Sequence, residues 1–389
     1  MQFRKLLFWL HLILGCLGGL VILVMSLTGV LLTYERQILA RVERGAFPVT
    51  PGTQRLPLEG LLSRVVEQRG ALPAGATVIV RSSPKVPVEL NLGKDGLSYV
   101  DPYTGQILGS PDRQWRGFFQ KVTGFHRWLG GEGEWRAIGK AITGACTLAF
   151  LALVLSGLYL WMPRQWTWQH LAPITWFRAG LSGKARDFNW HNVIGIWAAV
   201  PLFFVIVSIL PIAYPWANQL IYQVTGTSMP KTESAAPLKV STSFAGFDRL
   251  WQQAAQQSPG WQSISFRLSG ATPIAFVIDR GDGGQPQLRG TLTLDRDTAE
   301  LVRWESFADF NTGRQVRMYS RFLHTGEALG IVGQTIAGLA SLGGVVMVWT
   351  GLALAWRRFL AWRKRRSGQT EPDRVIEGRK ASEVESRAV

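Results

Sequence analysis

Four long stretches without Lys, Arg, Asp or Glu constrain the fold of this 389-residue chain more than any other feature. A helix needs about 20 mainly apolar residues to cross the hydrocarbon layer of a bilayer. Each stretch reaches that length, and such runs are hard to place in a soluble core. We therefore predict a membrane protein with four spans, at residues 6–34, 141–162, 188–216 and 328–356.

The positions of Lys and Arg beside these stretches predict the orientation of the chain. Basic residues that flank a span mark its cytoplasmic side. We therefore expect a multi-pass protein of the bacterial inner membrane with both termini in the cytoplasm, and with 35–140 and 217–327 on the outer, periplasmic side. The basic residues lie before the first span, between the second and third, and after the fourth: Arg4, Lys5, Arg164, Arg178, Lys184, Arg186, Arg357, Arg358 and the run 363–366.

The formal net charge of +16 does not indicate nucleic-acid binding. The basic residues gather beside spans, and no basic folded domain is visible. Cys16 and Cys146 both lie inside apolar stretches, so the sequence offers neither a disulfide framework nor a cysteine metal site. The stretch 13–16 resembles a lipoprotein cleavage site, but apolar residues continue through Leu32, which favours an uncleaved span.

Each outer segment has the pattern of a small α+β domain. In the first, a helical pattern over 57–70 precedes strands at 77–80 and 88–92 and a strand–turn–strand unit at 99–108. The sequence Asp101-Pro102-Tyr103-Thr104-Gly105 supplies the turn of that unit. The second segment repeats this order, with a helix near 243–257, strands near 262–268 and 273–278, and a strand–turn–strand unit at 292–302.

The repeated order predicts an internal duplication. Its unit is a span, an outer domain, a histidine and a second span, at 1–163 and again at 187–357. The predicted fold class is membrane α-helical: a four-helix bundle with two small α+β outer domains. The predicted organisation is a first span at 1–34, an outer domain at 35–125, a histidine-bearing segment with the second span at 126–163, a cytoplasmic loop at 164–187, a third span at 188–216, an outer domain at 217–323, a fourth span at 324–357, and a basic, disordered cytoplasmic tail at 358–389.

Four of the five histidines form two equivalent pairs. His11 and His191 stand near the cytoplasmic starts of the first and third spans, whereas His126 and His324 stand just before the second and fourth. Neutral imidazole is a good axial ligand for haem iron, and two imidazoles on facing helices fill both axial positions. The pattern therefore suggests two six-coordinate haems, one near each membrane face. His170 has no repeat partner and is interpreted as an interface residue.

Two other uses of these histidines stay open. A lone interfacial histidine is more often a polar anchor, although an ionisable residue within a span is a functional candidate. A zinc or copper site is disfavoured because no carboxylate or cysteine stands at ligand spacing and the two pairs are a membrane thickness apart. Glycines near the inner pair leave room for a flat macrocycle or, equally well, allow close helix packing: Gly15, Gly18, Gly19 and Gly195.

His126 lies farther from its span than His324 does. Charged residues separate it from that span, and a continuous helix would lift it roughly 20 Å above Lys140. Either Gly130 and Gly131 break this helix, or the second and fourth spans protrude and the outer haem lies under the outer domains.

Two arginines beside the outer histidines are candidate contacts for the haem propionates. Arg127 follows His126 directly, and Arg321 lies three residues before His324. A guanidinium group pairs well with a carboxylate. The alternative is that both are solvated interface charges.

Motifs spread along nearly the whole chain carry a resemblance to a known family. They are Trp9-Leu10-His11, Val100-Asp101-Pro102-Tyr103-Thr104-Gly105, Phe125-His126-Arg127-Trp128-Leu129, Ser156-Gly157-Leu158-Tyr159-Leu160-Trp161, His191-Asn192-Val193-Ile194-Gly195 and Leu323-His324-Thr325-Gly326. Through them the chain resembles the PepSY-associated transmembrane family, which includes haem-containing inner-membrane reductases of ferric siderophores of the ferrioxamine type. The second outer domain departs from the pattern, since Arg296 and Ala299 replace the Pro and Gly of the turn.

The resemblance implies two b haems with His11, His191, His126 and His324 as axial ligands, and electron delivery to a ferric siderophore in the periplasm. Reduction loosens such a chelate because hard anionic oxygens suit Fe(III) better than Fe(II). No G-x-G-x-x-G after a strand and no P-loop occurs, so the electron donor is expected to be a quinol or a cytoplasmic reductase.

Membrane lipid is the other expected partner, and two alternative functions stay open. The outer domains could serve a non-enzymatic binding or regulatory protein. The chain could also transport the ferric chelate, an option that Pro201 and Pro211 in the third span keep alive, because transporters use interrupted helices.

Overall fold

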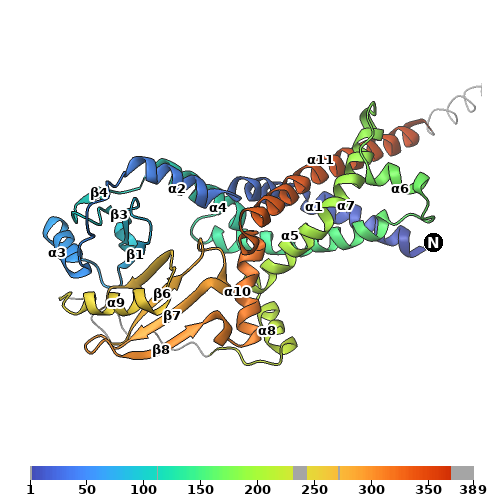
Figure 1. Cartoon of the computed structure of the whole chain (residues 1–389). Helices are drawn as coiled ribbons and strands as arrows, with labels where there is room; N and C mark the ends of the chain where they lie inside the picture. The colour runs from blue at the N-terminus through green and yellow to red at the C-terminus, as the bar shows by residue number, and fades with distance from the viewer. Residues whose placement is uncertain (1, 112, 231–242, 270–271, 369–389) are drawn as a thin grey trace, which may run out of the picture. The chain divides into compact units, whose positions relative to one another are not determined.

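The computed structural model describes residues 2–111, 113–230, 243–269 and 272–368, and the tail from 369 onward lies outside the described residues. The chain divides into two compact units (Figure 1). The first unit comprises Met1–Val30, Gly124–Ile206 and Gly338–Val389, and the second comprises Leu31–Thr123 and Val207–Ala337. Each unit is described by itself below.

Among the described residues, four helices are long and apolar enough to cross a membrane. Helix α11 has 39 residues, so at about 1.5 Å per residue it is longer than the roughly 30 Å hydrocarbon layer. Its basic C-terminal turns therefore continue beyond the apolar stretch. The four predicted spans are confirmed as α1 (Gln2–Leu32), α5 (Trp135–Trp161), α7 (Gly183–Ala213) and α11 (Gly330–Gly368).

Small residues let the helices of the first unit approach closely. A Cβ atom placed on Gly344 would lie 2.9 Å from Oγ of Ser26, and one on Gly343 would lie 3.2 Å from Cβ of Ala198. Close approach of this kind is the usual basis of helix association in lipid. The buried apolar cluster of this unit consists of Val154, Ala198, Ala199, Leu202, Ile206 and Ala340.

The second unit contains one antiparallel sheet of eight strands in the order β4-β3-β2-β1-β5-β6-β7-β8 (Figure 1). Strand β1 pairs with β5 at its centre, from Thr77 opposite Arg267 to Arg81 opposite Ser263. The strands are β1 (Thr77–Arg81), β2 (Val88–Asn91), β3 (Leu97–Val100), β4 (Ile107–Gly109), β5 (Ser263–Arg267), β6 (Ile274–Asp279), β7 (Arg289–Leu294) and β8 (Leu301–Ser306).

The two outer segments share this sheet instead of forming two separate sheets. Each contributes a helix followed by four strands, as predicted, and the helices are α3 (Leu58–Arg69) and α9 (Phe247–Gln257). One apolar core includes residues of both segments, among them Leu62 and Val78 from the first and Phe247 and Phe276 from the second. Joining β1 to β5 removes two exposed strand edges, which a separate four-stranded sheet would leave unpaired.

The two strand–turn–strand units have the same geometry despite their different sequences. In the first, the Asp101 carboxylate accepts hydrogen bonds from the backbone N–H groups of Tyr103 and Thr104, and Gly105 has φ +71°. In the second, the Asp295 carboxylate accepts hydrogen bonds from the backbone N–H groups of Asp297 and Thr298, and Ala299 takes the left-handed conformation at φ +61°. The departures from the family pattern at positions 296 and 299 therefore leave the turn unchanged.

Shorter helices connect the spans to the sheet or lie beyond the spans. The α-helices among them are α2 (Glu35–Ala46), α4 (Arg113–Trp128), α6 (Trp168–Thr175), α8 (Pro215–Val224) and α10 (Thr312–His324). Within the part of the chain that the structure describes, the 3-10 helices are η1 (Gly93–Asp95), η2 (Pro286–Leu288), η3 (Phe307–Asp309) and η4 (Glu327–Leu329).

Candidate functional site

Two of the predicted ligands, His11 of α1 and His191 of α7, face each other within the first unit. Their ring centres are 6.4 Å apart, and their ring planes are nearly perpendicular, at 86°. Both side chains are half-buried. Residues that are 180 positions apart in the sequence are thus brought together by the packing of the long helices.

The spacing of this pair fits two axial ligands on one metal. An imidazole nitrogen binds a metal such as zinc at about 2.0–2.1 Å and lies about 1.1 Å from its ring centre, so two imidazoles on opposite sides of one metal have ring centres roughly 6.3 Å apart. The observed separation of 6.4 Å matches this value. The pair alone supplies two ligands, and a haem brings its own four equatorial nitrogens.

Each inner histidine contacts a hydroxyl group on another span. Nδ1 of His11 lies 2.8 Å from Oγ of Ser156 on α5, and Nδ1 of His191 lies 3.0 Å from Oγ1 of Thr350 on α11. In both cases a glycine follows the hydroxyl residue, and a Cβ on that glycine would lie 3.4 Å (Gly157) or 3.3 Å (Gly351) from Cε1 of the imidazole. A larger residue there would crowd the ring.

His126 has the same kind of partner. It lies in the last turn of α4, and its Nδ1 is 3.0 Å from both Oγ1 of Thr28 and the backbone oxygen of Met25 on α1. Gly29 follows Thr28, and a Cβ on it would lie 3.6 Å from Cε1 of His126. Sequence reasoning gave these hydroxyl residues no role, although the recurring hydroxyl–glycine dipeptide in three spans was a signal that could have found them.

A break between α4 and α5 places His126 beside α1. Helix α4 ends at Trp128, Leu129 and Gly130 take left-handed conformations with φ +54° and +74°, and α5 begins at Trp135. The two helices then pack so tightly that a Cβ on Gly139 would overlap the Trp128 carbonyl oxygen. Of the two alternatives predicted for His126, the helix break is confirmed.

His324 is the last residue of α10 and belongs to the second unit, whereas His126 belongs to the first. The pairing of these two outer histidines stays a prediction. His170 lies exposed on α6, where its Nδ1 is 2.6 Å from Oγ1 of Thr167 at the helix start. Across the described ranges, no group of three or more His, Cys, Asp or Glu side chains is arranged to hold a metal ion without further ligands.

The two arginines predicted to contact propionates lie beside aromatic rings. The Arg127 guanidinium is 5.0 Å from the ring centre of Trp128, and that of Arg321 is 5.6 Å from the ring centre of Phe322. Phe322 lies two residues before His324 and is buried at 6% exposure, so its side chain fixes the end of α10 that carries His324. Contacts of either arginine to a propionate stay a prediction.

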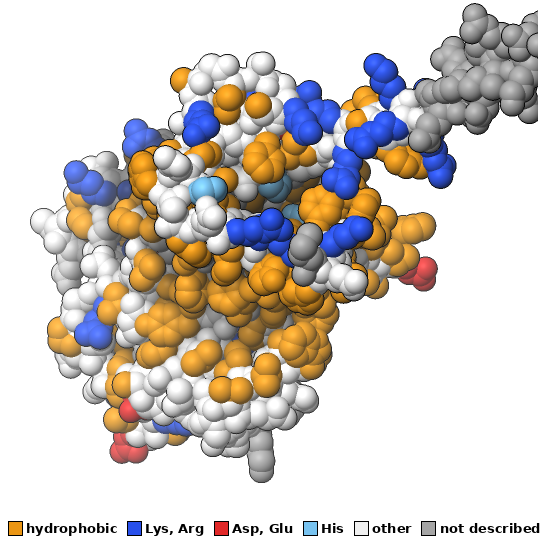
Figure 2. Space-filling model, turned by 90° about the vertical axis from the view of Figure 1, so that its right-hand side faces the viewer, with side chains coloured by type: hydrophobic (Ala, Val, Ile, Leu, Met, Phe, Trp, Pro, Cys, Tyr) orange, Lys and Arg blue, Asp and Glu red, His pale blue; other side chains and the backbone are white. Residues whose placement is uncertain are grey.

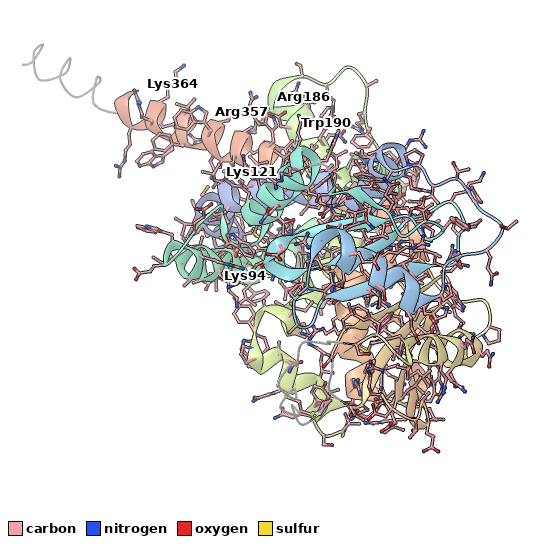
Figure 3. All side chains as sticks on the ribbon, turned by 90° about the vertical axis from the view of Figure 1, so that its left-hand side faces the viewer. Lys94, Lys121, Arg186, Trp190, Arg357 and Lys364 are labelled. Atoms are coloured by element: carbon pink, nitrogen blue, oxygen red, sulfur yellow. The ribbon has the colours of Figure 1, made fainter. Side chains whose placement is uncertain are left out.

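Two arginines pair with a buried acid near the start of α7. The carboxylate of Asp187, which is 1% exposed, forms ion pairs with Arg186 at 2.8 Å and Arg357 at 3.0 Å. The Arg186 guanidinium also lies 5.6 Å from the ring centre of Trp190 (Figure 3). The view in Figure 2 shows Lys and Arg side chains gathered among apolar ones at the upper part of this face. This mixture of basic and apolar side chains is typical of the end of a membrane span.

A family model matches most of the chain. The family described as the PepSY-associated TM region matches residues 8–358. The matched range includes all four paired histidines and their three observed hydroxyl partners. No curated protein matches the chain.

Proposed function

The chain belongs to the family of the PepSY-associated TM region, and from this premise we propose that it is a membrane electron carrier with two b haems that reduces a ferric siderophore. The observation that carries the proposal is the His11–His191 pair, whose ring centres stand 6.4 Å apart. One haem lies between these two residues in the proposal, and the other lies between His126 and His324.

The proposed protein lies in the bacterial inner membrane, with both termini in the cytoplasm and the sheet in the periplasm. The excess of basic residues beside α1, α7 and α11 supports this orientation. In the proposal the chain arose by duplication, since each half holds a span, a helix with four strands, a histidine and a second span.

The residues of the chain have distinct tasks in this proposal. Bound haem would supply a one-electron couple whose potential depends on its ligands and burial. His11 and His191 would hold the inner haem iron, and the glycines beside them keep the imidazole rings uncrowded. Arg127 and Arg321 neutralise propionates at the outer position, because guanidinium and carboxylate groups pair strongly.

The substrate side of the reaction needs neither an acid nor a nucleophile from the protein. One electron converts a bound Fe(III) to Fe(II), and the hard oxygen ligands then hold the metal less tightly. A quinol that delivers two electrons and releases two protons would reduce two ferric chelates in turn. A cytoplasmic reductase could deliver the same electrons one at a time.

The transporter alternative has lost its main support. It rested on interruption of the third span at Pro201 and Pro211, but α7 is helical without a break from Gly183 to Ala213. Binding sites of such transporters are typically formed by discontinuous helices.

Electron transfer across a sealed vesicle tests the proposal. The full chain is reconstituted in lipid vesicles whose membrane contains a quinone and whose interior contains a reductant. A ferric trihydroxamate chelate and an Fe(II)-specific dye are added outside. Dye colour is expected with the wild-type chain and with His170→Ala, the matched control, but not with His11→Ala. Equal rates for His11→Ala and the wild-type chain would contradict the proposed function.

A further inference from the structure

The three hydroxyl groups that contact histidines each use their proton on their own helix. Ser156 donates to the Leu153 carbonyl at 3.2 Å, Thr350 donates to the Val346 carbonyl at 2.8 Å, and Thr28 donates to the Val24 carbonyl at 2.6 Å. This back-bonding to the preceding helical turn is a common use of Ser and Thr hydroxyls in helices. A hydroxyl group has one proton to donate, so towards the imidazole each of these oxygens can only accept.

With the hydroxyl protons on those carbonyl oxygens, the proton of each neutral imidazole lies on Nδ1. An imidazole nitrogen without a proton would face the lone pairs of the hydroxyl oxygen at 2.8–3.0 Å, which is repulsive. The case of His126 is supported independently, because the Met25 carbonyl oxygen, 3.0 Å from Nδ1, can never donate. Nε2 is then the nitrogen that carries the lone pair.

We propose that Ser156, Thr350 and Thr28 are positioning residues that hold His11, His191 and His126 in the Nδ1–H tautomer, with Nε2 ready to bind a metal. The identity of that metal as haem iron rests on the proposed function. Partners of this kind orient a ligating histidine and raise its basicity, and their removal typically weakens metal binding by about 10–100-fold. A fixed tautomer also removes the cost of moving a proton when the ligand binds.

The repeat of the sequence assigns a hydroxyl partner to His324 as well. Ser208 lies 180 residues after Thr28, the same interval that separates His191 from His11. It is buried at 7% exposure in α7 and belongs to the second unit, as His324 does. We therefore infer that Ser208 is the positioning residue of His324.

Nitrogen-15 NMR of selectively labelled histidine measures the tautomer directly. The full chain is purified without haem, and each signal is assigned by replacing one of the five histidines with Gln. We expect Nδ1 protonated and Nε2 unprotonated at the four paired positions, and a shift of the His191 proton towards Nε2 in Thr350→Val. Protonation of wild-type His191 on Nε2 would overturn the inference, whether or not the chain binds haem.

Haem retention in the loaded protein provides the second measurement. Transfer of haem to excess apomyoglobin is expected to be about 10–100-fold more favourable from Thr350→Val and Ser156→Ala than from the wild-type chain. Thr350→Ser and Ser156→Thr keep the hydroxyl group and should retain haem as the wild-type chain does. The midpoint potential of the inner haem should rise in Thr350→Val, because a weaker ligand donor favours Fe(II).

The outcomes separate the two proposals. If Thr350→Val matches the wild-type chain in both retention and potential, the positioning role is wrong while the proposed function stands. If the purified wild-type chain binds no haem, the proposed function fails, and the NMR measurement still decides the tautomer.

Discussion

The inner and outer histidines are positioned by different means. His11 and His191 lie within long helices, and helix packing alone brings their rings to 6.4 Å. His126 and His324 lie at the C-terminal ends of the short helices α4 and α10, each just before the turn into the following span. The inner pair therefore depends on the side chains between helices, whereas each outer histidine depends on a backbone turn.

This difference leads to a general expectation about tolerance. A tightly packed bundle responds even to a small change in side-chain volume, so the inner pair should be sensitive to substitutions at the helix contacts beside it. A short turn that contains positive φ angles fixes the direction in which the preceding helix, and the histidine on it, leaves the span. Gly130 and Gly326 both have such angles, at +74° and +76°. Substitutions at the turns should therefore affect the outer position and leave the inner one intact.

The largest expected effect is the loss of the inner haem in His191→Ala. Removal of one of two axial ligands leaves the iron with a single imidazole, so about one haem per chain should be lost. Haem per chain, measured as the pyridine haemochrome, checks this outcome. His170→Ala is the matched control and should keep two, and equal haem content in the two variants would contradict the assignment.

The second expected effect is selective loss at the outer position in Gly139→Ala. The new Cβ would overlap the Trp128 carbonyl oxygen, so α4 must move away from α5 and take His126 with it. Overpacking of this kind costs about 1–3 kcal/mol. We expect one haem to be lost while the His11–His191 haem keeps its spectrum, as shown by low-temperature EPR.

Gly117→Ala is the matched control for this test, because Gly117 lies on α4 and a Cβ there meets nothing within 4 Å. Its haem content should equal that of the wild-type chain. A Gly139→Ala variant with both haems unchanged would mean that the helix break does not position His126.

A smaller effect is expected for Gly130→Ala. Alanine at φ +74° costs about 1–2 kcal/mol, and its Cβ would lie 3.1 Å from the ring of Phe125. The thermal midpoint should fall and the outer haem should dissociate faster, with the inner haem unaffected. Faster loss of the inner haem than of the outer one would contradict the claim that the turn positions the outer histidine.

The smallest expected effect concerns Glu35, which begins α2 just after the first span. Burial raises the pKa of this carboxyl group, with Arg116 lowering it and Glu327 raising it further. A raised pKa stabilises the folded protein fully below the unfolded value of 4.5, and this contribution is lost as the pH rises through the folded value. Chemical denaturation from pH 4.5 upward should show a steeper loss of stability in the wild-type chain than in Glu35→Gln.

The spans, the positions of the strands along the chain and the inner pair could be predicted from the sequence because each depends on a short pattern or on its repetition. Apolar length marks a span, alternation marks a strand, and the Asp-led turn at 101–105 marks the end of one. Ala299 shows the limit of such patterns. It takes the left-handed conformation that Gly105 takes, because the Asp295 carboxylate and the strand pairing impose it.

Long-range pairing could not be predicted in the same way. Nothing local distinguishes β1 as the partner of β5, so two separate domains were expected where one sheet exists. The hydroxyl partners of the histidines come from other helices, and the contact of Ser156 with His11 joins residues 145 positions apart. Such contacts depend on how helices rotate about their axes, which hydropathy does not encode. The position of His126 also depends on contacts between helices, so the sequence left both a helix break before α5 and protruding spans as alternatives.

The account depends most directly on what the purified wild-type chain binds. A combined measurement of haem per chain and of the EPR spectrum of the oxidised protein in detergent tests it. The account predicts two b haems per chain, both low-spin with two histidine ligands. A folded chain that binds no haem, or that binds only high-spin haem with one axial ligand, would contradict it.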